Sequence, residues 1–200
     1  MTTRTLPLSL RGRLLRAAAI PAIVVLGATA CSSGGSSSDA GATTAPSPSK
    51  ALAALNAGLK AQTAGDLTAA TADYNTTLKY DATNKYAFYN LALIDEASSN
   101  YGLAEAKYRS AIKSDAKYEP ALFNLAILRT GPDPKEAISL YKTAVAANPK
   151  DAAAWLNLGL LERTNKAVRA GDKDVLKAIA LDPSLKDPAK AVKSNGTSSP

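Results

Sequence analysis

The chain has 200 residues, 46% of them hydrophobic, which is enough for a leader segment and one domain with a core. It contains no histidine and one cysteine, Cys31, which argues against a zinc site of the usual spacing and against a disulfide framework. The formal net charge of +7 falls to +3 without residues 1–30, and no run of Lys and Arg is interleaved with aromatic residues, so we expect no nucleic-acid partner.

Residues 1–30 have the pattern of a secretory signal. Residues 4–16 are basic, and the stretch AAAIPAIVVLGATA (17–30) is uncharged and mostly apolar. This apolar stretch is too short to predict a membrane span. Ala28 and Ala30 are small, as signal cleavage requires, and Cys31 follows directly.

The segment LGATAC, which ends at Cys31, resembles the lipobox of bacterial lipoproteins. In that family the cysteine receives a diacylglyceryl thioether and becomes the mature N-terminus. The resemblance therefore implies lipidation of Cys31 and anchoring on the extracytoplasmic side of a bacterial cell membrane, since two acyl chains hold a protein stably. Ala28 departs from the leucine that the family usually has. The alternative is an ordinary secretory signal with a cysteine near the cut.

A segment rich in Ser, Gly, Ala and Pro follows, over residues 31–49. Its side chains cannot bury a core, so we expect a flexible tether between the anchor and the folded domain.

Residues 51–185 repeat themselves at steps of 34 or 33 residues. The tyrosines Tyr74, Tyr108 and Tyr141 align at these steps. A file of small residues aligns in the same register: Gly58, Ala92, Ala126 and Gly159. Such a period predicts a stacked repeat protein. The one-residue shortening falls in the segment TGPDPKE, which we place between two helices.

The segment FYNLALIDEASSNYGLAEAKYRSAIKSDA (88–116) resembles a tetratricopeptide repeat. The resemblance implies an all-α, right-handed superhelix of about four helical hairpins, over residues 51–84, 85–118, 119–151 and 152–185. In the second repeat we expect helices over about 86–98 and 103–114. Residues 186–200 would then form a short cap and a disordered tail.

The two end repeats depart from the family pattern. The first has Ala54 where the others have Phe88, Leu122 and Trp155, and the fourth has Gly171 and Val175 where the others have Ala and Tyr. Terminal repeats are expected to be atypical.

The first helices are apolar on both faces, with an asparagine in the middle of one. Asn90 lies about 200° round the helix from Phe88. In the tetratricopeptide family the first helices line a concave groove, and several members grip a peptide backbone there with asparagines. The peptide-binding groove that the resemblance implies comprises Asn56, Asn90, Asn124, Asn157, Tyr86, Tyr89, Leu93, Phe123, Ile127, Leu156 and Leu160. The alternative is that the amides only keep the groove solvated.

An amide supplies two donors and an acceptor, which suits an extended peptide backbone. Some family members clamp acidic C-terminal tails with cations, but the neighbouring positions here are Leu55, Leu59 and Pro120. We therefore expect a protein partner that offers an apolar extended segment or an amphipathic helix.

Asp95, Arg129 and Glu162 form another file, one repeat apart, with alternating charge. This pattern favours a ladder of ion pairs between neighbouring repeats. The alternative is a polar specificity site at the edge of the groove.

The sequence thus predicts a membrane-anchored scaffold of the bacterial cell envelope without cofactor or metal. A structural subunit whose groove is permanently filled is the alternative. The absence of histidine, of a Gly-rich phosphate loop and of a recognisable carboxylate pair argues against an enzyme.

Overall fold

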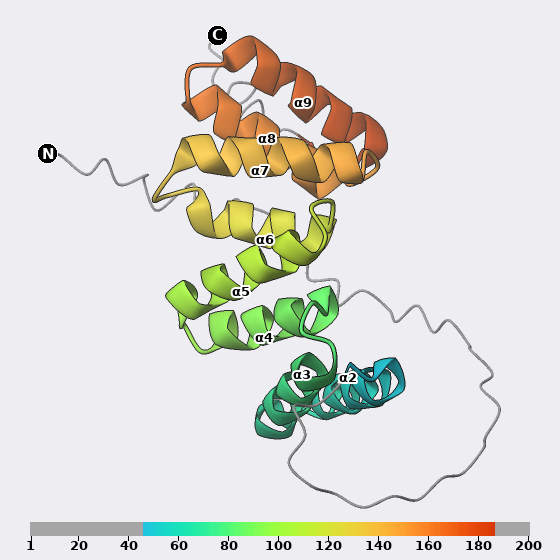
Figure 1. Cartoon of the computed structure of the whole chain (residues 1–200). Coiled ribbons are helices and arrows are strands. Elements are labelled where there is room, and N and C mark those ends of the chain that lie inside the picture. Colours follow the sequence, from blue (N-terminus) through green and yellow to red (C-terminus); the bar gives the residue numbers. More distant parts are fainter. Residues whose placement is uncertain (1–45, 187–200) are drawn as a thin grey trace, which may run out of the picture.

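The computed structural model describes residues 46–186, and within this range all regular structure is helical (Figure 1). The predictions for residues 1–45, which include the leader and Cys31, and for the tail 187–200 lie outside the described residues. The helices are α2 (Pro48–Thr63), α3 (Leu67–Tyr80), α4 (Lys85–Ala97), α5 (Tyr101–Ser114), α6 (Glu119–Arg129), α7 (Pro134–Ala147), α8 (Ala152–Thr164) and α9 (Val168–Leu181).

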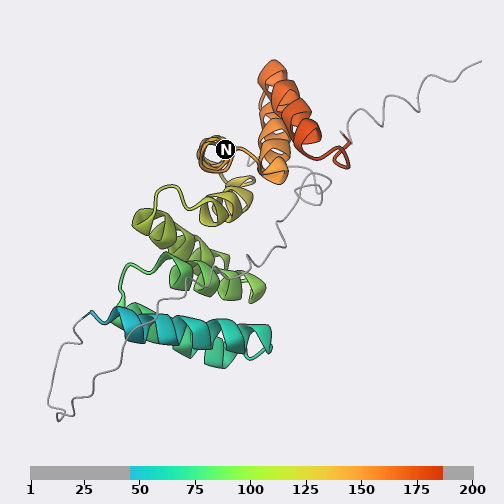
Figure 2. The ribbon, with the colours of Figure 1, turned by 90° about the vertical axis from the view of Figure 1, so that its right-hand side faces the viewer.

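The helices form four hairpins stacked from α2/α3 to α8/α9 (Figures 1 and 2). Within a hairpin the two helices pack along their lengths, and successive hairpins meet through α3–α4, α5–α6 and α7–α8. Within residues 46–186 the predicted all-α fold of eight helices is confirmed. The expected helices of the second repeat differ from the observed ones by one or two residues at three of their four ends. The predicted tether ended at residue 49, but α2 already begins at Pro48, because proline is tolerated in the first helical turn.

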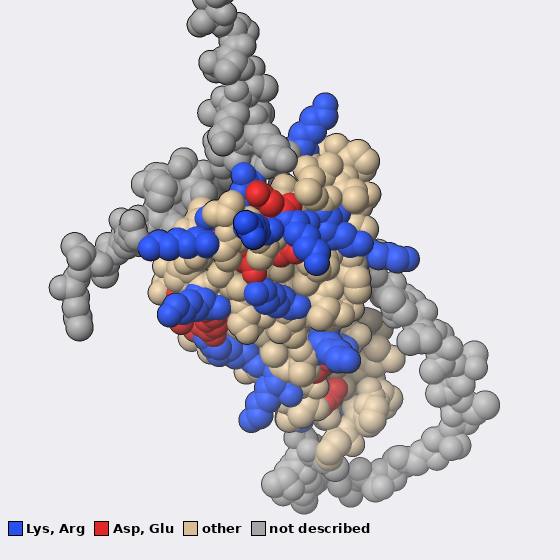
Figure 3. All heavy atoms as spheres, turned by 90° about the horizontal axis from the view of Figure 1, so that it is seen from above, with Lys and Arg blue, Asp and Glu red and all other residues tan. Residues whose placement is uncertain are grey.

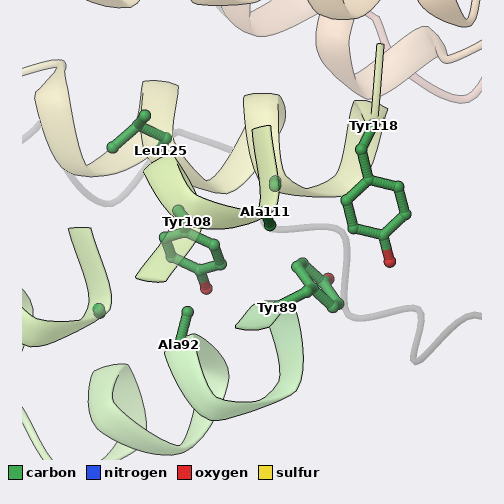
Figure 4. Packing of buried hydrophobic residues seen from close by; sticks show 8 residues of the cluster. Tyr89, Ala92, Tyr108, Ala111, Tyr118 and Leu125 are labelled. Carbon is green, nitrogen blue, oxygen red and sulfur yellow. The ribbon is translucent and has the colours of Figure 1, made fainter. Parts of the chain in front are cut away.

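The core is built from large tyrosines packed among alanines. Tyr74, Tyr108 and Tyr141, from the second helices, have no exposed surface. Around Tyr108, the small residues Ala92 and Ala111 let the helices approach (Figure 4). Two of the three tyrosine hydroxyls are hydrogen-bonded: Tyr74 donates to Gln62 (2.5 Å) and Tyr108 donates to Glu96 (3.0 Å), each on the first helix of its own hairpin.

Most turns within hairpins contain a residue with positive φ at the same repeat position. Gly65, Ser99 and Lys166 have φ values of 83°, 62° and 70°. The turn after α6 has no such residue. There Asp133 N–H donates to Arg129 C=O at 2.8 Å, and α6 has 11 residues where α4 has 13. The shortening thus falls in α6, and the turn 130–133 is longer than the turn 98–100, whereas the sequence placed the deletion between the two helices.

The links between hairpins share one hydrogen-bond pattern. In the first link, Asp81 N–H donates to Thr77 C=O (2.8 Å) and Asn84 N–H donates to Asp81 C=O (3.1 Å). The segment after α9 repeats it, with Asp182 N–H donating to Ala178 C=O (2.8 Å) and Leu185 N–H to Asp182 C=O (3.1 Å). The chain therefore leaves the last hairpin in the geometry that elsewhere leads into another first helix.

Helices α8 and α9 approach more closely than a side chain at the crossing would allow. A Cβ atom at Gly159 would lie 2.6 Å from the carbonyl oxygen of Gly171. A Cβ atom at Gly171 would in turn meet the Gly159 carbonyl and Arg163. This contact explains why the fourth repeat has Gly171 where the other repeats have alanine.

Candidate functional site

The residues predicted to form a groove all lie on the first helices α2, α4, α6 and α8, and we call this side of the molecule the first-helix surface. Their exposure is uneven. Asn56 and Tyr86 are exposed, and Leu93, Ile127 and Leu160 are partly buried. Tyr89, Asn90, Asn124 and Leu156 retain only 4–8% of their accessible surface. Phe123 and Asn157, at 1% and 0%, face the core, which corrects their predicted place on a ligand-facing surface.

The asparagine file is not one row of open amides. Asn90 Nδ2 donates to the Tyr86 carbonyl of its own helix at 2.9 Å. Asn124 Nδ2, on α6, donates to the Tyr89 hydroxyl on α4 at 3.2 Å, in a buried contact. Burial raises the pKa of Tyr89 to about 12, while the hydrogen bond with Asn124 acts in the opposite direction. Asn124 therefore joins the third repeat to the second.

Asn157, on α8, lies close to the buried Tyr141 hydroxyl of α7. Burial raises the pKa of the Tyr141 hydroxyl, and side-chain interactions with Thr130 and Asn157 oppose that shift. The expectation of four ligand-facing amides is thus wrong for Asn157, and Asn124 is engaged inside the molecule. Sequence reasoning missed these contacts because Tyr89 and Tyr141 belong to different files of the repeat.

A cavity of about 660 Å³ lies at the N-terminal end of the first-helix surface. Its apolar walls are Leu52 and Leu55 from α2, Tyr80 from the end of α3, and Tyr86 from α4. We call it the N-terminal pocket. Sequence reasoning named only Leu55 and Tyr86 among these. The missed signal was that Leu52 precedes Tyr86 by one 34-residue repeat.

The tetratricopeptide repeat profile matches residues 55–119 and 131–185, which is more than half of the chain. The chain belongs to the tetratricopeptide repeat (TPR) family. None of the curated proteins matches it.

Solved TPR structures share the fold at low sequence identity. The crystal structure of MamA aligns with a TM-score of 0.60 at 19% identity, covering 68% of this chain and 81% of MamA. The structure of pilF from Pseudomonas aeruginosa gives 0.59 at 23% identity, covering 68% of this chain and 64% of pilF. The first TPR domain of Spaghetti, solved with an HSP90 peptide, gives 0.55 at 20% identity, covering 60% and 97%. These likenesses concern the fold alone.

In this TPR protein the three members of the charged file, Asp95, Arg129 and Glu162, do not form ion pairs with one another. Asp95 pairs with Lys107 of its own hairpin. Arg129 lies 3.3 Å from Glu105 in the preceding repeat and 2.6 Å from Glu136 in its own. Glu162 lies 2.8 Å from Lys142 in the preceding repeat. The predicted ladder is therefore corrected: each member pairs with a second helix, and two of the three bridge neighbouring repeats.

The Arg129 cluster also shifts the ionisation of its acid. Burial alone would raise the pKa of Glu105, but hydrogen bonds and charge from Arg109 and Arg129 hold it below the usual range. Glu105 thus stays ionised between the two arginines and joins the second repeat to the third.

Two carboxyl pairs join elements that are distant in sequence. Burial, followed by a hydrogen bond and the charge of Asp151, raises the pKa of Glu119 to about 8. Burial and the neighbouring Glu162 raise the pKa of Asp174 to about 6. Sequence reasoning found no carboxylate pair, because no local spacing signals a contact between residues 119 and 151.

Other features of the described residues add little to the site. Between residues 46 and 186 no group of three metal-ligating side chains is found, and no helix has the length and apolarity that crossing a membrane requires. Seen from the α9 end, Lys and Arg side chains are scattered among acidic and uncharged ones (Figure 3).

Proposed function

We propose that this TPR protein is a lipid-anchored, non-catalytic scaffold of the bacterial cell envelope that holds a partner protein or peptide on its first-helix surface. The TPR fold indicates a protein-interaction scaffold. One observation supports this surface: at one common repeat position, every first helix leaves a large aliphatic side chain only partly buried. These side chains are Leu59, Leu93, Ile127 and Leu160. Apolar surface that recurs at one position of every repeat is a candidate binding site.

The anchor rests on the lipobox resemblance at Cys31. Two acyl chains on this cysteine would hold the protein on the extracytoplasmic face of the membrane. Replacing Cys31 with serine should move the protein from the membrane fraction to the soluble fraction of fractionated cells. A Cys31→Ser protein that stays in the membrane fraction would refute the anchor.

The ligand that suits this surface is an apolar extended segment or an amphipathic helix. Asn56 is exposed, and Asn90 retains an acceptor and a second N–H beyond its bond to Tyr86. These two amides lie in the N-terminal half of the molecule. We therefore place backbone recognition on α2 and α4 rather than along all four repeats.

The surface is tested by photo-crosslinking in living cells. A photoreactive amino acid at Leu93, on the first-helix surface, should give a discrete crosslinked partner. The same group at Lys113, exposed on the second helix α5, is the matched control and should give little product. Equal products from both positions would exclude selective binding at the first-helix surface.

The amides need a separate arm of that experiment. Adding Asn90→Ala to the Leu93 probe should reduce the crosslinked product, because a backbone contact of the partner is lost. An unchanged product would remove Asn90 from the binding account while leaving the surface in place.

A further inference from the structure

The N-terminal pocket combines a hollow with exposed apolar side chains at one end of the first-helix surface. It is formed where the start of α2, the end of α3 and the start of α4 meet. Among residues 46–186, only seven large hydrophobic side chains are exposed, and two of them, Leu52 (52%) and Tyr86 (47%), line this one cavity. Apolar surface of this kind gains free energy when a partner covers it.

The aromatic walls are held in place before any partner arrives. The Tyr86 ring meets the Tyr118 ring edge-on, with centroids 5.7 Å apart. Lys85 Nζ lies 5.2 Å from the Tyr86 centroid and 5.1 Å from that of Tyr118, and it is ion-paired with Asp115 at 2.6 Å. A wall that is already ordered loses little conformational entropy on binding.

The opposite wall is fixed by the segment that leads into α2. Ser47 N–H donates to the Tyr80 carbonyl at 3.2 Å, and Lys50 Nζ lies 5.4 Å from the Tyr80 ring centroid. Pro46 and Pro48 therefore form part of the pocket lining.

The rim has an excess of positive charge. Three ammonium groups, those of Lys50, Lys79 and Lys85, lie at or beside the lining, against the two carboxylates of Asp81 and Asp115. Asp115 offsets Lys85, which leaves Lys50 and Lys79 against Asp81. Asp81 accepts from Thr83 N–H (3.2 Å) and from Asn84 Nδ2 (2.9 Å), while Asp115 is paired with Lys85. An approaching carboxylate thus meets a net attraction.

The protein's own flanking segments do not offer a side chain for this pocket. Residues 32–45, which precede the lining, read SSGGSSSDAGATTA and contain no large apolar residue. Residues 187–200 offer only Val192 beside two lysines. Neither of these two segments supplies a bulky apolar side chain for the pocket.

We propose that the N-terminal pocket binds a bulky apolar side chain on an extended segment of a partner protein, with acidic residues beside it. This inference rests on the proposed scaffold function and narrows the partner to an acidic, apolar peptide at the α2–α4 end. Leu52 and Tyr86 contact the apolar side chain, and the lysines at the rim attract the flanking carboxylates.

Fluorescence anisotropy with the full chain tests this with three labelled synthetic peptides of eight residues. The first has two central leucines with aspartates on both sides, the second replaces the aspartates with lysines, and the third replaces the leucines with serines. The first peptide should bind at least about tenfold more tightly than either of the others, because it alone supplies both the apolar side chain and the charge. Equal affinity for the aspartate and lysine peptides, or no binding of the first, overturns the proposal.

Matched variants locate the binding. Leu52→Asp should weaken binding of the first peptide about tenfold. Leu176→Asp changes a side chain of similar exposure, 55%, on α9 at the far end of the solenoid and should leave binding unchanged. Equal effects of the two variants would place the peptide elsewhere and contradict the proposal.

A charge reversal at the rim gives an independent arm. Lys79→Glu should weaken binding of the aspartate peptide and strengthen that of the lysine peptide, with unchanged helical circular dichroism. If the Lys79→Glu protein keeps the preference of the parent for the aspartate peptide, the role of the rim charge is refuted. If the peptides do not bind while the Leu93 probe still gives a crosslinked partner, the pocket inference is refuted and the scaffold function stands. If neither the Leu93 probe nor the Lys113 probe gives a crosslinked partner, the scaffold function itself is refuted.

Discussion

At the scale of single residues, the same file of the repeat performs different tasks in successive hairpins. Asn56 is exposed, Asn90 bonds its own helix, and Asn124 donates to the Tyr89 hydroxyl of the preceding repeat. Asparagine is a poor helix former, so its presence in the middle of first helices requires a gain elsewhere. For Asn124 that gain is the connection to the preceding repeat.

The turn residue Ser99 carries a backbone conformation that suits glycine better. With φ of 62°, its Cβ is close to the following carbonyl. Replacing Ser99 with glycine should raise the free energy of unfolding by about 1 kcal/mol, measured by urea denaturation. Ser98→Gly is the control, because φ there is −85° and glycine only adds disorder to the unfolded chain. Equal effects of the two changes would contradict the explanation.

Gly171→Ala should destabilise the protein although alanine occupies this position in the other repeats. The new methyl group would meet the carbonyl of Gly159 and the backbone of Arg163, an overpacking that costs about 1–3 kcal/mol. Gly102→Ala is the matched control on α5, since a Cβ there meets nothing within 4 Å. Thermal unfolding should show a lower Tm for the first variant and an equal or higher Tm for the second, because alanine favours helix. A Gly171→Ala protein as stable as the parent would disprove the close approach.

At the scale of helices, the sequence predicted existence and order well, because the 34-residue period repeats in several independent files. The boundaries of α4 and α5 follow from local signals, and Asn84 caps α4 by accepting from Ala87 N–H at 3.0 Å. Exposure on the first helices was not predictable in the same way. The helical angle of Phe123 and Asn157 is that of a groove residue. Phe123 is nevertheless buried against α7 and α8, and Asn157 beside Tyr141 of α7, and these contacts come from other elements of the fold.

The carboxyl contact between α6 and the N-terminus of α8 makes stability depend on pH. The folded-state pKa of Glu119 is raised from 4.5 to about 8, first by burial and then by Asp151. Its stabilising contribution is therefore present below pH 4.5 and is lost as the pH rises toward 8. Glu119→Gln should be more stable than the parent by about 1 kcal/mol at pH 8, after allowance for solvent screening, and nearly equal at pH 4.5.

Urea denaturation at the two pH values measures the difference for Glu119→Gln. The chain has no histidine to titrate between them, although Asp174, whose pKa is raised to about 6, contributes equally to both proteins. Parallel stability curves for parent and variant would show that the carboxyl group is not held neutral.

At the scale of the whole molecule, stacking of like hairpins was predictable and the position of the open pocket was not. A period in the sequence specifies which elements are neighbours, and all substantial helix contacts here join successive helices. The cavity, however, results from residues of α2, α3 and α4 together with their connecting segment. Such a place is defined only once three elements have packed.

Stability should vary along the array because end hairpins have one neighbour and inner ones have two. Hydrogen exchange should be slower for amides of α4–α7 than for those of α2 and α9. Mass spectrometry of exchanged peptides measures this directly. Uniform protection from residue 48 to residue 181 would indicate a single cooperative unit instead.

The link after α9 has a consequence for engineering. Because residues 182–185 have the hydrogen bonds of the inner links, a copy of residues 119–151 inserted after Leu185 would begin in the geometry of an existing hairpin. The array could then be lengthened in whole units without redesigning a joint. Its reach would become a quantity that gene duplication can adjust, independently of the pocket at the opposite end.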